Sequence, residues 1–415
     1  MSTYSNSQNT GSDFMSIAKT LGHDEALKAG SNEVRTTITP KNLEHARAVF
    51  SRAGAEERAK RGKLFFDRIG YRSRKPEGRH DRAFSYILAD GQITQDDETP
   101  VAKFLEGLNI EAVSIGDKTL GPNEVWNLGT STNPVVLNID TLTMEVGSRI
   151  EIYNTVLSLT CQNVIRNGST GPSAAAANYD IGIFGVQPSP PPVGSQGGTG
   201  GVGIAGSGGT CKCSNTEPGN NGGKGDMGGQ GGQGSPGAPG DNGLPALTAE
   251  ITILNSLGGT SGTLAIKSQG GVGAIGGKGG KGGTGGTGGK GGNGARCSGT
   301  CTNGGDGGPG GTGGPGGPGG QGGNGATAED VMVTVPDDAA KRIFRILASS
   351  NPGDGGPGGD PGDGGAGGAG GDGVSHNICG GGDKGSTGKP GVAGAKGPIG
   401  EHGGLAGRII INGVG

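Results

Sequence analysis

The chain has 415 residues, of which 100 are glycine, and only 30% are hydrophobic and 3% aromatic. Average proteins contain about 7% glycine, so this composition excludes one large apolar core and leaves much of the stability to the backbone. The formal net charge of −3 excludes nucleic acid as an expected partner, and no apolar run approaches the ~20 residues that would span a membrane.

The first part of the chain has an ordinary composition and is expected to form a polar, partly helical head (residues 1–107). Apolar residues recur at helical spacing from Leu43 onward, which predicts one helix over residues 43–66. Basic residues outnumber acidic ones over residues 41–82. This excess indicates either a docking surface for an acidic partner or a solvated helical face, and the solvated face is favoured. The polar N-terminus lacks an apolar signal segment, so we expect an extracellular or particle-surface location reached without a conventional signal peptide.

Residues 108–193 are expected to form a strand region that ends in a proline-rich loop. Four short runs of alternating apolar residues lie between Val135 and Cys161, separated by two or three polar residues. This spacing is too tight for crossover helices. It fits either tight hairpins or the sides of a parallel β-helix, of which the β-helix is favoured.

The third part, residues 194–415, follows a period of three. Glycine occupies every third position in six runs, at residues 194–209, 219–243, 270–294, 304–325, 353–371 and 385–403. An extended helix with three residues per turn places such positions in one straight row, and bare glycine rows let neighbouring chains approach closely. The runs are therefore expected to pack as polyglycine-II helices, interrupted by β hairpins at residues 247–268 and 330–347.

Side chains in these runs are confined to particular rows, which predicts where each run lies. The run at residues 270–294 has two rows that are mostly bare glycine, and its third row, which includes Lys278 and Lys281, must face solvent. The run at residues 353–371 carries an acidic row and is expected at an edge with that row outward. The run at residues 385–403 has nearly one glycine row only and is expected to be the most peripheral.

The triplet runs resemble the polyglycine-II sandwiches of T-even-type phage tail-fibre adhesins, of the snow-flea antifreeze protein and of mycobacterial PGRS domains. The resemblance covers about residues 194–405 and rests on the triplet pattern. In the adhesins an N-terminal attachment part precedes the glycine sandwich and distal loops bind host receptors, so the resemblance implies a similar order of parts here. The runs also satisfy Gly-X-Y and are similar to collagen. Most triplets are Gly-Gly-X, however, so a laterally packed bundle is favoured over a collagen trimer.

The six cysteines suggest disulfides, because an even number in a chain with a weak core is typical of an oxidising destination. The disulfide candidates are Cys211, Cys213, Cys297, Cys301 and Cys379. Pairing of the first two with the next two would staple one end of the bundle, with the fifth as an additional partner. Neither close pair has the spacing of a zinc site, and Cys161 is the best candidate for a buried free thiol.

The expected fold class is mainly β with a polyglycine-II/PPII helix bundle, short β-helix-like or hairpin strands and a small α-helical N-terminal head. The expected function is that of a non-enzymatic structural or assembly protein of a surface fibre, filament or virion-like particle. The alternative is an adhesin that recognises a surface receptor or glycan through tip loops at residues 167–193 and 374–384. We expect self-association, and no cofactor, metal or catalytic site, because the strand carboxylates Asp140, Glu145 and Glu151 are scattered.

Overall fold

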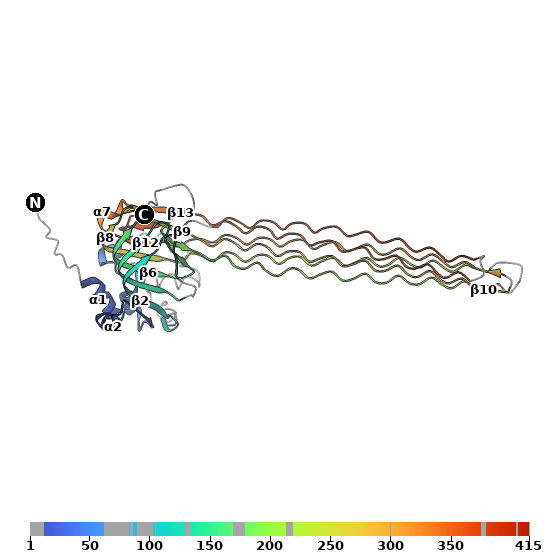
Figure 1. Ribbon diagram of the computed structural model, residues 1–415, viewed down its shortest axis with the longest axis horizontal. Helices are drawn as coiled ribbons and strands as arrows, with labels where there is room; N and C mark the ends of the chain where they lie inside the picture. Colours follow the sequence, from blue (N-terminus) through green and yellow to red (C-terminus); the bar gives the residue numbers. More distant parts are fainter. Residues whose placement is uncertain are drawn as a thin grey trace, which may run out of the picture.

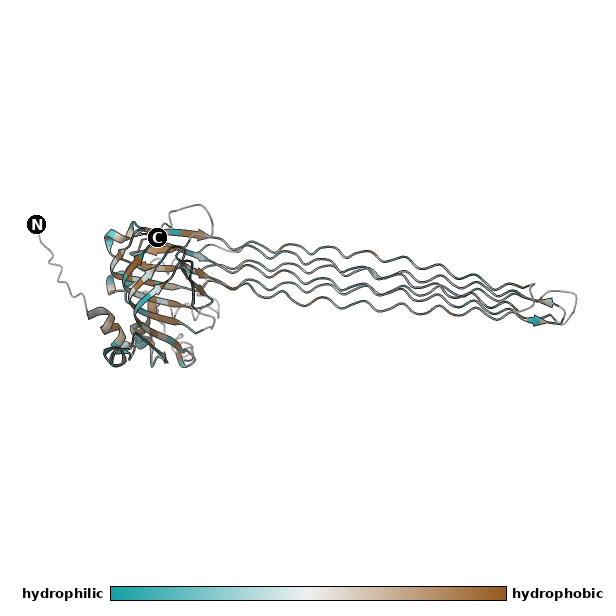
Figure 2. Cartoon of the chain, viewed as in Figure 1, coloured by the Kyte–Doolittle hydropathy of each residue, from teal (hydrophilic) through white to brown (hydrophobic). Residues whose placement is uncertain are grey.

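The computed structural model describes residues 12–61, 83, 86–88, 103, 105–128, 133–168, 179–212, 219–298, 300–374, 379–403 and 406–414. Helices and strands from the whole length of the chain form one globular part, which is called the head from here on and is not confined to residues 1–107. Glycine-rich extended segments project from one side of it as a long spike (Figure 1). Figure 2 shows that hydrophobic residues gather in the strands of the head, whereas the spike is mostly of intermediate or polar hydropathy. Apolar packing therefore stabilises the head, whereas the spike depends on contacts between backbones.

Two β-sheets form the centre of the head. In the seven-stranded sheet the order is β1-β2-β4-β6-β8-β12-β14, where β1 is antiparallel to β2 and the other pairs are parallel. Its strands are β1 (Glu33–Ile38), β2 (Ile110–Leu120), β4 (Val135–Met144), β6 (Leu157–Arg166), β8 (Ala249–Gly258), β12 (Val331–Thr334) and β14 (Ile409–Ile411). The five-stranded sheet is parallel, in the order β13-β9-β7-β5-β3. Its strands are β3 (Val125–Leu128), β5 (Arg149–Tyr153), β7 (Ile181–Phe184), β9 (Leu264–Gln269) and β13 (Ile343–Ala348). From β2 to β9, and again from β12 to β14, successive strands alternate between the sheets.

Apolar side chains fill the space between the two sheets. Register partners in four adjacent strands form one buried row, in which every side chain is at most 1% exposed; the row comprises Leu137, Leu159, Ile251 and Val333. Burying one such side chain stabilises the fold by about 1.5–3 kcal/mol. Cys161, two residues beyond Leu159 in β6, is a free thiol in the same core, and burial raises its pKa so that it stays protonated.

Short helices cover the other face of the seven-stranded sheet. They are α1 (Ser12–Thr20), α2 (Asp24–Lys28), α3 (Leu43–Phe50) and a helical stretch at residues 55–61, while α7 (Asp337–Ala340) connects β12 to β13. Val49 and Phe50 of α3 are fully buried in a second apolar cluster with Ala112, Val136 and Met332 of the sheet. Because both faces of this sheet are covered, its central strands are buried on both sides, and the side under the helices also carries buried polar residues such as Ser114, Asn138 and Glu250.

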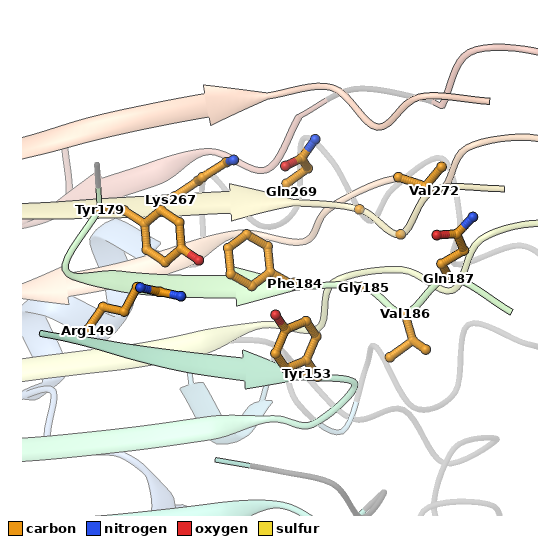
Figure 3. A pocket seen from close by; sticks show the side chains of 12 residues that line it. Arg149, Tyr153, Tyr179, Phe184, Gly185, Val186, Gln187, Lys267, Gln269 and Val272 are labelled. Atoms are coloured by element: carbon orange, nitrogen blue, oxygen red, sulfur yellow. The ribbon is translucent and has the colours of Figure 1, made fainter. Parts of the chain in front are cut away.

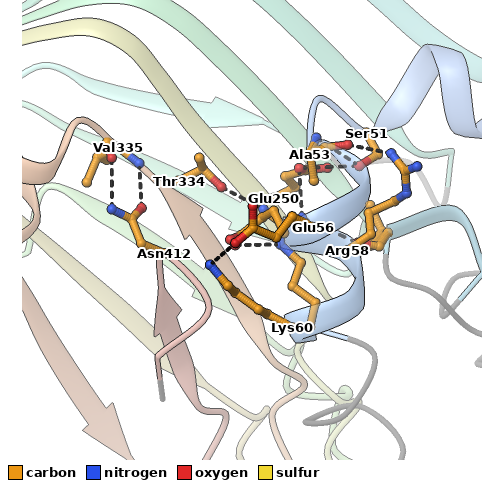
Figure 4. A network of polar contacts seen from close by, with 12 residues as sticks. Ser51, Ala53, Glu56, Arg58, Lys60, Glu250, Thr334, Val335 and Asn412 are labelled. Carbon is orange, nitrogen blue, oxygen red and sulfur yellow. Dashed lines mark hydrogen bonds and ion pairs between the residues drawn. The ribbon is translucent and has the colours of Figure 1, made fainter. Parts of the chain in front are cut away.

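The prediction of one helix over residues 43–66 is wrong within the described part. Helix α3 ends at Phe50 because Ser51 adopts an extended backbone with φ −102° and ψ 134°. A second helix then begins at residue 55, and residues 62–66 lie outside the described residues. This break turns the second helix so that Arg61 reaches the sheet, where its guanidinium lies 2.9 Å from the Glu250 carboxylate and both side chains are 1% exposed. Figure 4 shows the polar network around Glu250 and Thr334, which joins the helix to β8 and β12.

The spike consists of three excursions, each of which runs out from the head and back. Segments 1, 3 and 5 run outward from β7, β9 and β13 and comprise residues 186–209, 270–294 and 350–373; segments 2, 4 and 6 return toward β8, β12 and β14 and comprise residues 219–246, 303–328 and 380–403. Backbone hydrogen bonds join segments 1-3-5 in one layer and segments 2-4-6 in another, and further bonds connect the layers. The outward layer therefore continues the five-stranded sheet, and the return layer continues the seven-stranded sheet. A short hairpin of β10 (Arg296–Cys297) and β11 (Thr300–Cys301) lies at the far tip.

The position of a segment in the spike decides how many glycine rows it needs. In segment 3, Gly282 donates to the carbonyl of Asp360 in segment 5, and Gly283 donates to that of Gly232 in segment 2, at 2.9 and 2.8 Å. A Cβ added at Gly283 would lie 1.9 Å from the carbonyl oxygen of Gly198 in segment 1, whereas a Cβ added at Gly198 would meet nothing within 4 Å. A central segment thus needs two bare rows, and an edge segment needs one.

Lysine and aspartate rows lie against each other along the spike. The pairs are Lys278–Asp360, Lys281–Asp363 and Lys290–Asp372, at 2.9, 3.1 and 3.3 Å. Segment 5 lies at the end of its layer with its acidic row exposed to solvent, as expected, and three of these aspartates also pair with the lysines of segment 3. These pairs are solvent-exposed and screened by water, so they set the alignment of the segments more than their stability.

The fold class expected from the sequence is wrong. The chain is an α/β fold with a seven-stranded mixed sheet, a five-stranded parallel sheet and short helices, and not a mainly β assembly of polyglycine-II helices and hairpin strands. The segments at residues 247–254 and 263–268, expected to form a hairpin, lie in different sheets as parts of β8 and β9. After each excursion the chain forms a strand beside one that precedes the excursion in the sequence. The two strands pair in parallel, so no local hairpin forms.

Candidate binding site

Four of the predicted disulfide candidates meet at the far end of the spike. The sulfurs of Cys211 and Cys297 are bonded, and so are those of Cys301 and Cys379. Cys297 and Cys301 belong to the β10–β11 hairpin at the far tip (Figure 1). The two disulfides therefore join the tip of the middle excursion to both neighbouring tips. Cys213 lies outside the described residues.

The loop at residues 167–193, expected at a tip, does not lie there in its described part. Residues 181–184 form β7 in the head, and residues 186–193 begin segment 1. Among the described residues no group of three or more His, Cys, Asp or Glu side chains is arranged to hold a metal ion. No helix in that part of the chain has the length and apolarity to cross a membrane.

A pocket of about 520 Å³ lies where the spike begins, on the outer face of the five-stranded sheet (Figure 3). It is formed by β5, β7 and β9 together with the first residues of segments 1 and 3. Side chains that shape it include Arg149, Tyr153, Tyr179, Phe184, Lys267 and Gln269. Its volume falls in the range of small-molecule sites, about 300–1,000 Å³.

The local sequence of β5 and β7 explains why this face is polar and aromatic. In β5, Ile150 and Ile152 point into the core, so the alternate residues Arg149, Glu151 and Tyr153 point outward. The register places Glu151 beside Gly182 of β7, and Gly182 beside Lys267 of β9. The absent side chain of residue 182 leaves a gap in this outward row.

Two aromatic rings occupy the gap above Gly182. A Cβ added there would lie 2.3 Å from a ring carbon of Phe184 and 2.6 Å from a ring carbon of Tyr179. These two rings meet edge to face with centroids 5.2 Å apart, and the ring of Tyr153 lies 5.4 Å from that of Phe184. Glycine at 182 is therefore what allows three rings to form a continuous wall.

The Glu151 carboxylate fixes the two tyrosines. Its Oε1 accepts hydrogen bonds from Tyr179 and from Arg149 Nε, both at 2.6 Å, and its Oε2 accepts one from Tyr153 at 2.8 Å. Burial alone would raise the pKa of Glu151, but these three donors outweigh it and lower the pKa, so the carboxylate stays charged. Burial and the bond to Glu151 raise the pKa of Tyr153 to about 12, which keeps its hydroxyl a donor.

Two cations flank the same rings. The Lys267 ammonium lies 5.6 Å from the ring centroids of both Tyr179 and Phe184, and the Arg149 guanidinium lies 6.0 Å from that of Tyr179. Lys267 is only 8% exposed, and burial lowers its pKa. The described lining thus combines aromatic faces with two basic groups and includes no carboxylate.

The arrangement is suited to binding and not to hydrolysis by paired acids. Glu151 is 8% exposed and is bonded to three donors. The nearby Asp180 is fully buried and forms an ion pair with Arg166 at 2.7 Å. Neither carboxylate is therefore placed to act on a molecule in the pocket as a general acid or nucleophile.

Sequence reasoning placed Glu151 among scattered carboxylates and missed the pocket. A signal was present in the alternation of Arg149, Glu151 and Tyr153 against two buried isoleucines. Its partners, however, come from strands about 30 and 115 residues further along the chain. No family model matches the chain, and comparison with curated proteins and with solved structures gives no significant match.

Proposed function

We propose that this chain is a non-enzymatic projecting component of a surface or of a virion-like particle, in which the head is the attachment part and the spike carries the tip outward. The observation that carries the proposal is the arrangement of the three excursions. All leave and re-enter the head at one side, and disulfides link their tips at the far end.

The construction of the spike supports a role in which reach and rigidity matter. Segment 3 has 25 residues in the range 270–294, which span roughly 75 Å at the ~3.1 Å rise of an extended chain with three residues per turn. Ordering so many glycines is entropically costly, and the cost is offset by hydrogen bonds repeated every third residue along each segment. A costly arm of this kind has its clearest use as a spacer.

The two disulfides favour an oxidising destination outside the cytosol. Helix α1 lies on the side of the head away from the spike (Figure 1), which suits a head seated in an assembly with the spike pointing away from it. The triplet resemblance to phage tail-fibre adhesins supports the same order of parts. We also propose that copies of the chain associate in that assembly, which the mass in solution, with and without reductant, will test.

Immunogold electron microscopy of the source material tests the proposal. Antibodies are raised against the tip peptide, residues 294–303, and against a head peptide that contains α2. We expect both labels on a surface or particle, with the tip label further out by several nanometres. Recovery of the chain in a soluble cytosolic fraction, with no particle or envelope association, would refute the proposal.

A second candidate function is recognition of a surface receptor by the tip. It is favoured by the cross-linking of all three tips, because disulfides hold loops in the fixed geometry that recognition needs. In the test variant, glycine triplets replace residues 296–301, and glycine replaces their disulfide partners Cys211 and Cys379. This variant should fail to attach to target cells but should still be incorporated into the assembly. Loss of both together would favour the structural role alone.

A further inference from the structure

We propose that the pocket at the base of the spike binds a saccharide unit that carries a carboxylate. This site is distinct from the tip, and the proposal does not rest on the function proposed for the spike. It is argued from the rigid aromatic wall, from the charge of the lining and from the amides at the mouth.

The aromatic wall fits the face of a sugar ring. The rings of Tyr153, Tyr179 and Phe184 are partly exposed, and the two tyrosine hydroxyls are tied to Glu151. The C–H groups on one face of a pyranose are weakly positive and pack against the electron-rich face of an aromatic ring. Because the rings are already fixed, a ligand pays little conformational entropy to order them.

The charge of the lining selects an acidic sugar. Lys267 and Arg149 flank the Tyr179 ring, and the neighbouring carboxylate of Glu151 already accepts three hydrogen bonds. Among the described residues, Arg149 is ion-paired with Glu151 at 2.6 Å and Lys267 adds a further cation, so the lining carries a net positive charge. A carboxylate on the ligand gains more from Lys267 than from a surface lysine, because that side chain is 8% exposed and the local dielectric is low.

The mouth of the pocket adds amide groups suited to hydroxyls. Gln269 Nε2 donates to the Ser349 carbonyl at 3.1 Å, and Gln187 Nε2 donates to the Gly273 carbonyl at 3.3 Å. These bonds orient both amides, and Figure 3 shows the Gln269 oxygen on the side of Phe184. An oriented amide oxygen accepts a hydrogen bond from a sugar hydroxyl. Aromatic wall, cation and amide thus match the ring, the carboxylate and the hydroxyls of one acidic sugar unit.

Two glycosides that differ only at C6 test the proposal on the full chain. Methyl β-D-glucuronide carries a carboxylate there, and methyl β-D-glucoside carries a hydroxymethyl group. Titration calorimetry and saturation-transfer NMR should show saturable binding of the glucuronide, about ten-fold tighter than the glucoside. Lys267→Met should remove this preference, and Tyr179→Leu should weaken the binding of both glycosides.

Lys118→Met is the matched control, because the Lys118 ammonium also lies over an aromatic ring, that of Trp126 at 5.0 Å, but outside the pocket. It should leave the ten-fold preference unchanged. Lys267→Gln, which keeps a long polar side chain, serves if Lys267→Met does not fold. Equal affinity of the unaltered chain for the two glycosides, or equal loss of preference in the Lys118 and Lys267 variants, would overturn the proposal.

Discussion

Substituting alanine for one glycine in the middle of the spike tests how the segments are held. Gly283 lies in segment 3 and faces Gly198 of segment 1. An added Cβ at residue 283 would lie 1.9 Å from the Gly198 carbonyl oxygen, where ordinary contacts begin near 3.4 Å. Segment 1 must therefore move away by more than 1 Å, since the obstacle is backbone and not a side chain that can rotate.

The magnitude follows from the bonds that this movement breaks. Gly197 donates to the Lys281 carbonyl and Gly200 to the Thr284 carbonyl, both at 2.8 Å, on either side of the contact. Losing two backbone hydrogen bonds costs about 2 kcal/mol, and forcing a methyl group into a packed site costs about 1–3 kcal/mol more. We expect Gly283→Ala to lower the free energy of local opening by about 3–5 kcal/mol.

Hydrogen exchange measured by mass spectrometry checks this value peptide by peptide. In Gly283→Ala, amides at residues 194–209 should exchange at least about 100-fold faster, while strands of the head stay protected. Gly198→Ala is the control from the same contact, because its added Cβ would point into open space. It should leave exchange unchanged or slightly slower. Similar acceleration in both variants would mean that close backbone approach does not hold the spike.

Three further changes test the tip and the head. Cys301→Ser releases Cys379 and opens a cross-link that spans 78 residues, a constraint worth about 4 kcal/mol, so tip amides should exchange faster while the head is unaffected. Glu250→Gln leaves Arg61 buried without its closest carboxylate and should lower the unfolding free energy of the head by about 3 kcal/mol in a denaturant titration. Burial lowers the pKa of His23, so below a pH of about 6.5 the unfolded chain takes up a proton that the folded head does not. The unfolding free energy should therefore fall as the pH falls through this range, and His23→Gln should reduce this pH dependence.

Each of these expectations has a control or an outcome that contradicts it. If tip amides exchanged in Cys301→Ser at the same rate as in the unaltered chain, hydrogen bonds alone would hold the third excursion in place. Glu56→Gln is the control for Glu250→Gln, because Glu56 pairs with Lys60 at the surface, where its side chain is 86% exposed. If both variants lowered the unfolding free energy equally, burial of the Arg61–Glu250 pair would not explain the effect. An unchanged pH profile in His23→Gln would place the titrating group elsewhere.

In the glycine-rich part, the sequence predicts which rows of residues approach a neighbouring segment, and this made it more predictable than the head. A period of three is a local property, so the sequence alone indicates which residues approach a neighbour and which point away. The two bare rows of segment 3 and the single row of segment 1 correspond to a central and an edge position. What the rows do not specify is the identity of the neighbours. The pairing of Lys278 with Asp360 depends on the head, because the strands decide which segments start side by side.

The head was less predictable because its pairing is non-local. Alternation in β4 and β6 indicates strands, but it does not say that β6 pairs next with β8, more than 80 residues later. The pocket depends on the same pairings, since Glu151, Gly182 and Lys267 come from three strands that are neighbours only in the folded sheet. Local sequence around Glu151 offered Tyr153 as an aromatic neighbour but not Tyr179, so carboxylate spacing along the chain was the wrong criterion.

A shared register links the two parts. In the head, Ala249 of β8 is the register partner of Val331 in β12, which lies 82 residues further along the chain. In the spike, segments 2 and 4 continue toward these two strands, and the side chain of Asn221 accepts from the backbone of Asn303 at the same separation of 82 residues. The excursions can align along their length only if each returns to the head in step with its neighbour. Inserting a triplet in segment 3 alone would therefore shift every Lys–Asp pair with segment 5 beyond the insertion, whereas inserting matched triplets in all six segments would lengthen the spike and leave both the sheets and the tip disulfides in register.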